Sequence, residues 1–186
     1  MSTFKKTPYT VNVRDLLHKP GEMREHRFDI ATGEKLGEGL LAVPAGEELH
    51  VDLRLESVHE GILVSADVSA EAVGECSRCL RDIAQTVEVE FQELFAYSSD
   101  EAFDYEVHDD HVDLEPLIRD AVVLALPFQP VCTPDCAGLD PVTGERLADH
   151  PAQPAPDVID PRWSALAGLS SPQGSTASED TDTEAK

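Results

Sequence analysis

The sequence has 186 residues, with 14 Lys and Arg against 37 Asp and Glu, and a formal net charge of −23. This length suits one domain with extensions, and the charge argues against broad binding of a phosphate backbone, because two polyanions repel each other. The sequence shows neither the apolar run of a signal peptide nor the roughly 18 apolar residues of a membrane span, so we expect a cytoplasmic protein.

The charges are distributed unevenly. Six of the fourteen basic residues fall in the first thirty positions, and none lies between Arg81 and Arg119, where twelve acidic residues occur. A basic end and an acidic middle suit two different partners, whereas the simpler interpretation is solvated surface charge. The basic candidates for contact with RNA or another partner are Lys5, Lys6, Arg14, Arg78 and Arg81.

Residues 1–45 contain a short extended run and a brief helical turn at "VRDLL", and Pro20-Gly21 interrupts them. We expect this segment to wrap the core. Residues 46–150 begin with three segments of alternating polarity, near 49–55, 62–68 and 83–91. Because short connections join them, the pattern predicts an antiparallel β-meander with one face in solvent.

One amphipathic helix is predicted after the acidic segment 96–111, which lacks a clear period and is expected to be a loop or an irregular edge. Asp113 is a suitable N-cap, Pro116 suits the first turn, and Pro127 ends the apolar repeat. The fold class is therefore α+β: an antiparallel β-meander packed by one main core helix, followed by a cysteine-pair metal hook.

The C-terminal part, residues 151–186, is rich in Pro, Ala, Ser, Thr and acidic residues. Such a composition cannot bury enough apolar surface to offset the entropy of ordering, so a disordered acidic tail is predicted. A possible docked turn at 159–169, which contains Trp163, is the exception.

All four cysteines lie in two pairs, Cys76-x-x-Cys79 and Cys132-x-x-x-Cys136. In the reducing cytoplasm, closely spaced pairs indicate a metal or redox chemistry more than disulfides. Four thiolates at this spacing suit a tetrahedral structural zinc ion, with Arg78 and Arg81 offsetting part of the negative charge. Idle free thiols are the simpler alternative. A redox Cys-x-x-Cys is less suitable, because that motif is expected at a helix N-terminus beside a parallel sheet.

Four segments together carry a resemblance to a known family: 74–83 with "CSRCL", the helix 114–132, the hook 132–147 and the block 159–169. Across roughly residues 10 to 170 the chain resembles the YceD family of large ribosomal RNA subunit accumulation proteins. The hook of that family often reads G-L-C-P-x-C-G, so Asp140 and Thr143 replace two cysteines here. The resemblance places Cys76, Cys79, Cys132 and Cys136 on family cysteine positions.

The resemblance implies a non-enzymatic factor in the synthesis or accumulation of large-subunit ribosomal RNA and in large-subunit assembly. The implied partner is the assembling large subunit, through either its RNA or a basic ribosomal protein, with no membrane and no small-molecule substrate. One alternative is an acidic, chaperone-like module that binds a basic protein and has no role with ribosomal RNA. A metal-dependent hydrolase is a weaker alternative. Its divalent ion would be held by His108 and His111 with Asp109, Asp110 and Asp113, and these residues follow no regular spacing. Motifs for nucleotide binding and for a catalytic triad do not occur in the sequence.

Overall fold

The computed structural model describes residues 6–98, 104–150 and 162. The predicted disordered tail, the possible docked turn at 159–169 and Lys5 lie outside the described residues. In the described part of the chain, no helix combines the length and hydropathy that a membrane span requires.

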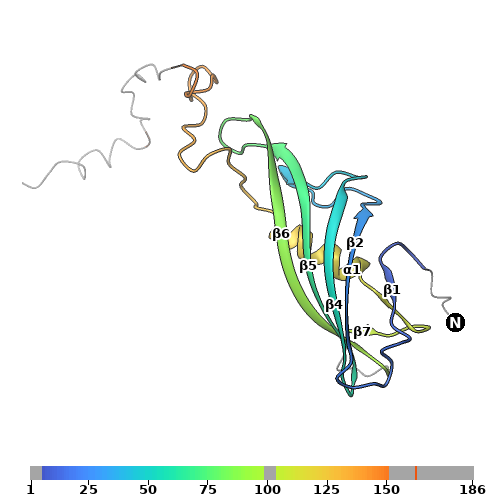
Figure 1. The fold of residues 1–186 in the computed structure, drawn as a ribbon. Coiled ribbons are helices and arrows are strands. Elements are labelled where there is room, and N and C mark those ends of the chain that lie inside the picture. Colours follow the sequence, from blue (N-terminus) through green and yellow to red (C-terminus); the bar gives the residue numbers. More distant parts are fainter. Residues whose placement is uncertain (1–5, 99–103, 151–161, 163–186) are drawn as a thin grey trace, which may run out of the picture. The chain divides into compact units, whose positions relative to one another are not determined.

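A curved, mostly antiparallel sheet forms the body of the fold (Figure 1). Its strands, in spatial order, are β2 (Met23–Ala31), β4 (Glu48–Ser57), β5 (Gly61–Glu75), β6 (Asp82–Ala96) and β7 (Tyr105–Glu106). The short strand β3 (Leu41–Ala42) pairs with the end of β5, and β7 runs parallel to β6. The predicted antiparallel arrangement of three sequential strands is confirmed, although each strand is longer than its alternating segment.

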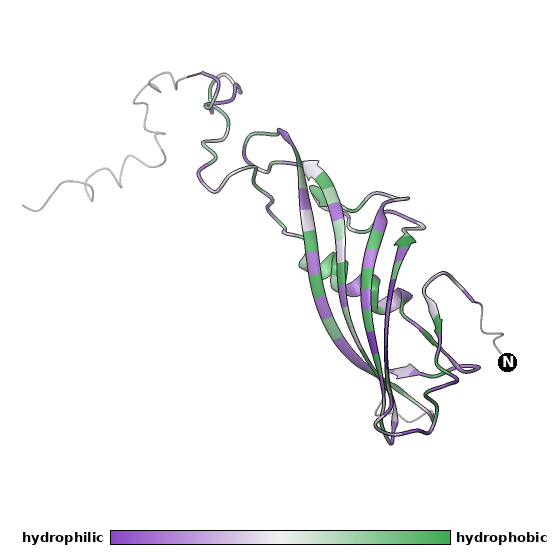
Figure 2. Ribbon diagram, in the orientation of Figure 1, coloured by the Kyte–Doolittle hydropathy of each residue, from purple (hydrophilic) through white to green (hydrophobic). Residues whose placement is uncertain are grey.

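One face of the sheet is buried and the other is exposed, which produces the alternating bands along the strands in Figure 2. The register aligns Leu53 of β4, Ala66 of β5 and Phe91 of β6 across the buried face. Along β4, every second residue from Leu49 to Leu55 is buried. This alternation follows from the two-residue period of a strand with one wet face.

Helix α1 (Glu115–Ala125) packs on the buried face through Leu117, Ile118 and Val122. It ends before Pro127, as predicted. The predicted cap is different: Leu114 occupies the N-cap position and makes no side-chain cap bond, while Asp113 accepts a 3.1 Å hydrogen bond from the Glu115 N–H. Asp113 is displaced from the cap because it is the last residue of strand β8 (His111–Asp113), which pairs with β1 (Thr10–Asn12).

The N-terminal segment is more than a wrapping of the core. Residues 23–31 form edge strand β2, which the sequence did not reveal, and residues 41–42 form β3. The first two residues of β2 that point toward the buried face are polar: Arg24 is half-buried and His26 is exposed at the sheet edge, and both obscure the hydrophobic alternation. The pair β1 and β8 brings Tyr9 to the start of α1, where its carbonyl accepts a hydrogen bond from the Leu114 N–H.

Candidate metal centre

The first cysteine pair lies in the connection between β5 and β6. Glu75 pairs with Asp82, so residues 76–81 form the turn of this hairpin. The turn is closed by two backbone bonds, from Cys76 N–H to the Arg81 carbonyl and from Leu80 N–H to the Cys76 carbonyl. Leu80 has φ 54°, the left-handed conformation that redirects the chain into β6. Both sulfurs of the pair are thereby turned to one side.

The second pair follows α1, which ends just before Pro127. The Ser77 N–H donates to the Pro130 carbonyl, and the Gln85 side-chain amide donates to the Val131 carbonyl. These bonds hold the chain against the hairpin just before Cys132. A turn bond from Cys136 N–H to the Thr133 carbonyl then folds the second pair back toward the first.

The four sulfurs converge. All four Sγ atoms lie within 4.8 Å of one another, with 3.8 Å between Cys76 and Cys136 and 3.7 Å between Cys79 and Cys132. A tetrahedron with Zn–S bonds of about 2.3 Å has sulfur–sulfur edges of about 3.8 Å, so the spacing fits that ion. Cys76 and Cys79 are buried, and Cys132 and Cys136 are half-buried. The predicted set of four thiols is therefore brought together from segments more than fifty residues apart.

The surroundings of Cys76 and Cys136 shift the pKa values of these two thiols in opposite directions. Burial opposes ionisation of Cys76, but backbone N–H groups of Cys79, Cys132 and Arg78 donate to its sulfur, and its pKa falls to about 6. The Gly138 N–H stabilises a thiolate at Cys136, yet burial and the three neighbouring thiol groups raise its pKa to about 12. Four thiolates at this spacing therefore need a cation, which a divalent metal supplies.

Two arginines hold the hook against the hairpin. The Arg78 guanidinium donates to the carbonyls of Pro134 and Cys136 at 3.1 and 3.2 Å. In the opposite direction, Arg146 donates to the carbonyls of Cys79 and Leu80 at 2.9 and 3.1 Å. The two loops that carry the cysteines are thus joined by side-chain hydrogen bonds as well as by the sulfur cluster.

Asp140 has a structural role that the sequence did not reveal. It is buried, and its carboxylate accepts hydrogen bonds from the N–H groups of Val142 and Thr143 at 2.7 and 3.0 Å. Gly144, at φ 74°, then donates to the Asp140 carbonyl. Residues 140–144 are therefore a tight turn closed by a carboxylate, at the place where the resemblance expects two further cysteines. The signal was present, because Asp followed by Pro and Gly is typical of such turns.

The predicted basic candidates are not brought together. Arg78 donates hydrogen bonds to the hook, and Arg81 forms an ion pair of 3.8 Å with Asp149. Lys6 and Arg14 are exposed. Arg14 lies 3.8 Å from Asp110. Close to it in the sequence, the His18 N–H donates to the hydroxyl of Tyr97, the residue that follows the end of β6. Because β5 has fifteen residues, its two ends are roughly 45 Å apart along the strand. Arg78 and Arg81 lie in the turn after one end, and Arg14 lies toward the other end.

The four predicted cysteines thus form one cluster. A comparison with known protein families matches the segment that contains them. The family model described as "Large ribosomal RNA subunit accumulation protein YceD" matches residues 64–170, which include both cysteine pairs. The chain belongs to the YceD family.

Individual relatives match more of this YceD-family chain than the family model does. It is 42% identical to the Mycobacterium tuberculosis protein Rv2926c over 177 residues, which cover 91% of this chain and 85% of the relative. It is 34% identical to the Mycobacterium leprae protein ML1660, over 93% of this chain and 82% of the relative. The Bacillus subtilis protein YlbN is 30% identical over 55% of this chain and 62% of its own. No solved structure matches the chain.

Proposed function

We propose that this protein is a non-enzymatic factor in the accumulation of large-subunit ribosomal RNA and in assembly of the large ribosomal subunit. The match of residues 64–170 to the YceD family carries this proposal. The cysteine cluster lies within the matched region and is, in our proposal, a structural zinc site that fixes the hook at residues 132–147 on the β5–β6 hairpin.

Zinc is favoured by the donor set and by the spacing. Four cysteine sulfurs are soft ligands, and sulfur–sulfur separations of 3.7 and 3.8 Å suit tetrahedral geometry. Four thiolates also leave no open coordination position for a substrate, which supports a structural role and a non-enzymatic protein.

A basic component of the assembling subunit is the partner that the surface chemistry favours. On the exposed face of the sheet, Asp52, Asp67 and Glu90 are direct neighbours across β4, β5 and β6. All three are exposed. Like charges directly opposite each other destabilise a sheet, so this row lowers stability and is better explained by binding of positive charge. Arg27 pairs with Asp52 at one end of the row.

Direct binding of ribosomal RNA is the competing form of the proposal. It would depend on Lys5, Lys6, Arg14, Arg78 and Arg81. Arg14 lies toward one end of the sheet and Arg78 and Arg81 lie at the other, and Arg78 is hydrogen-bonded to the hook. Scattered cations give weaker phosphate binding than one continuous basic face. We therefore favour a basic ribosomal protein as the contact within the assembling subunit.

Copurification from cells of the source organism tests the proposal. The tagged protein is isolated at low and moderate salt, and both retained RNA and retained proteins are identified. We expect large-subunit components, with one basic protein depleted strongly as salt rises. A variant with Asp52→Asn, Asp67→Asn and Glu90→Gln should lose that protein.

The matched control removes the same charge elsewhere. Glu38, Glu60 and Glu145 are exposed acids outside the sheet row, and their triple change to Gln should leave retention unaltered. Retention of RNA that depends on Lys6 and Arg14 instead would favour the RNA form. Capture of a basic protein with no large-subunit component would favour the acidic binding module without a ribosomal role.

A further inference from the structure

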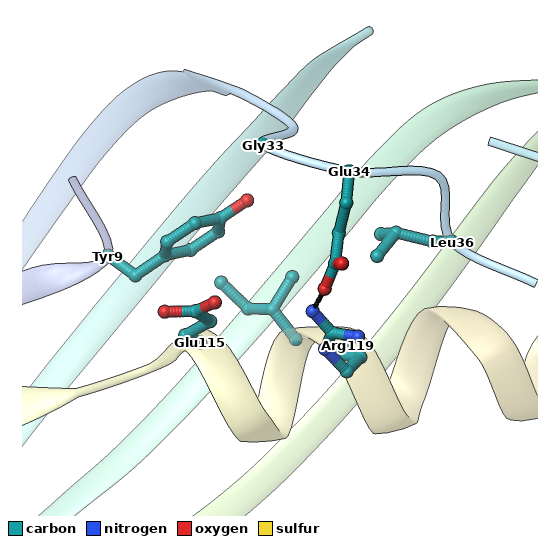
Figure 3. Close-up of a pocket in the computed structure, with 7 residues that line it drawn as sticks. Tyr9, Gly33, Glu34, Leu36, Glu115 and Arg119 are labelled. Carbon is teal, nitrogen blue, oxygen red and sulfur yellow. Dashed lines mark ion pairs between the residues drawn. The ribbon is translucent and has the colours of Figure 1, made fainter. Parts of the chain in front are cut away.

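A small pocket lies between the N-terminal strand, the loop after β2 and the first turns of α1. It has a volume of about 180 Å³. Figure 3 shows Tyr9 and Glu115 on one side of it and the Glu34–Arg119 ion pair on the other. Leu36 and Ile118 are buried and supply its apolar floor. Three segments distant in sequence thus converge on one cavity away from the cysteines.

The pocket has an uncompensated negative charge. Arg119 is paired with Glu34, which leaves the carboxylate of Glu115. Within residues 6–98, 104–150 and 162, no ion pair involves Glu115. Glu115 lies in the first turn of α1 and lines the pocket together with Tyr9. After burial, the Glu115 carboxylate is the next cause of the raised Tyr9 hydroxyl pKa, and the Arg119 guanidinium opposes it, so both charged groups lie close to the Tyr9 hydroxyl. Glu34 and Glu115 together carry two negative charges against the one positive charge of Arg119.

We infer that this pocket binds a cationic side chain, an arginine, presented by a basic partner protein. The face of the Tyr9 ring suits a cation, the Glu115 carboxylate suits its charge, and the apolar floor suits its aliphatic stem. Glu34 lies beside the same space and can share its second oxygen.

Arginine fits this set of groups better than lysine. A planar guanidinium stacks on an aromatic ring and presents two parallel N–H groups to a carboxylate. An ammonium group is a compact point charge with a stronger hydration shell, and it loses more on leaving water. The inference rests on the proposed function only for the class of partner, a basic protein of the assembling subunit.

A small probe tests the pocket directly. N-acetyl-arginine methylamide is titrated into the full chain, and backbone amide shifts are followed by NMR at low ionic strength. We expect saturable shifts at Tyr9, Gly33, Glu115 and Arg119, and weaker binding of the lysine analogue. The neutral citrulline analogue has nearly the same shape and should give no saturable shift.

Two variants and one control complete the test. Glu115→Gln should weaken binding of the probe about tenfold, since it removes a charged hydrogen-bond acceptor. Tyr9→Leu should weaken it about threefold by removing the ring. Glu71→Gln, an exposed acid on the other side of the sheet, should leave affinity unchanged.

Equal shifts with the citrulline analogue, or shifts spread over the exposed sheet face, would overturn the inference. Lysine binding as tight as arginine would overturn the preference for arginine. Because the probe contains no RNA and no ribosomal protein, its failure leaves the proposed ribosomal role standing. If the protein binds the probe but retains no large-subunit component in the copurification, the proposed ribosomal role is refuted and the arginine-binding pocket is supported.

Discussion

Replacement of Cys79 by Ser removes one of the four converging sulfurs, and its cost can be worked from the chain. A metal that joins Cys79 to Cys132 links positions separated by 52 residues. For a covalent link that closes a loop of this length, the chain-entropy relation gives about 4 kcal/mol of stabilisation. This value is an upper bound for a coordination link.

The hydrogen bonds of the hook lower that figure. Arg78 and Arg146 join the same loops without metal, so part of the constraint survives when the fourth ligand is lost. We expect a loss of about 2–4 kcal/mol, which corresponds to a fall in Tm of roughly 5–15 °C for a chain of this size.

Thermal unfolding and metal analysis together measure the effect. The wild-type protein should contain one zinc per chain, and a chelator should lower its Tm. The Cys79→Ser variant should contain little zinc, and the chelator should leave its Tm nearly unchanged. Ser77→Ala is the matched control. It changes a residue in the same turn, and within the described residues the Ser77 hydroxyl makes no hydrogen bond. A variant as stable as the wild type, with both proteins free of metal, would refute a metal-stabilised hook.

Three further predictions concern single side chains. Asp140→Ala should cost the hook about 1–3 kcal/mol through two lost acceptor bonds, and faster hydrogen exchange at the two amides should show it, whereas Asp140→Asn should exchange more slowly than Asp140→Ala. Gly74→Ala would place a Cβ 1.9 Å from a backbone oxygen and should destabilise by at least about 2 kcal/mol; Gly33→Ala, which meets nothing within 4 Å, should be nearly neutral in the same denaturant titration. His50 should titrate above its ordinary value, because the hydrogen bond that its ring donates to the Asp29 carboxylate raises its pKa, and Asp29→Asn should lower that pKa in an NMR titration. Any stabilisation from this pair is present below the unfolded pKa of about 6.5 and is lost as pH rises through the folded pKa.

The strands that could be predicted are those whose alternation is strong. Leu49, Val51, Leu53 and Leu55 alternate with polar residues, so β4 was readable from the sequence. Strand β2 was not, because an edge position tolerates Arg24 on the partly buried face. Helix α1 was predicted through its apolar repeat and Pro127, while its cap depended on the pairing of β8 with β1, which no local pattern encodes.

The candidate sites divide in the same way. Cysteine spacing predicted that the four thiols come together, because each pair is local and closely spaced pairs are typical of shared metal sites. The closure of the 140–144 turn by Asp140 required knowing which N–H groups the carboxylate faces. The pocket of Tyr9, Glu115 and Arg119 was missed, because its walls come from three separated segments that only the tertiary fold brings together.

The most direct test of the central proposal is the level of large-subunit ribosomal RNA in cells that lack this protein. RNA of both subunits is quantified in the deletion strain, and again after return of the wild-type gene or the Cys79→Ser variant. We predict a lower ratio of large- to small-subunit RNA in the deletion, restored by the wild type and poorly by the variant. An unaltered ratio in the deletion strain would contradict a role in large-subunit accumulation.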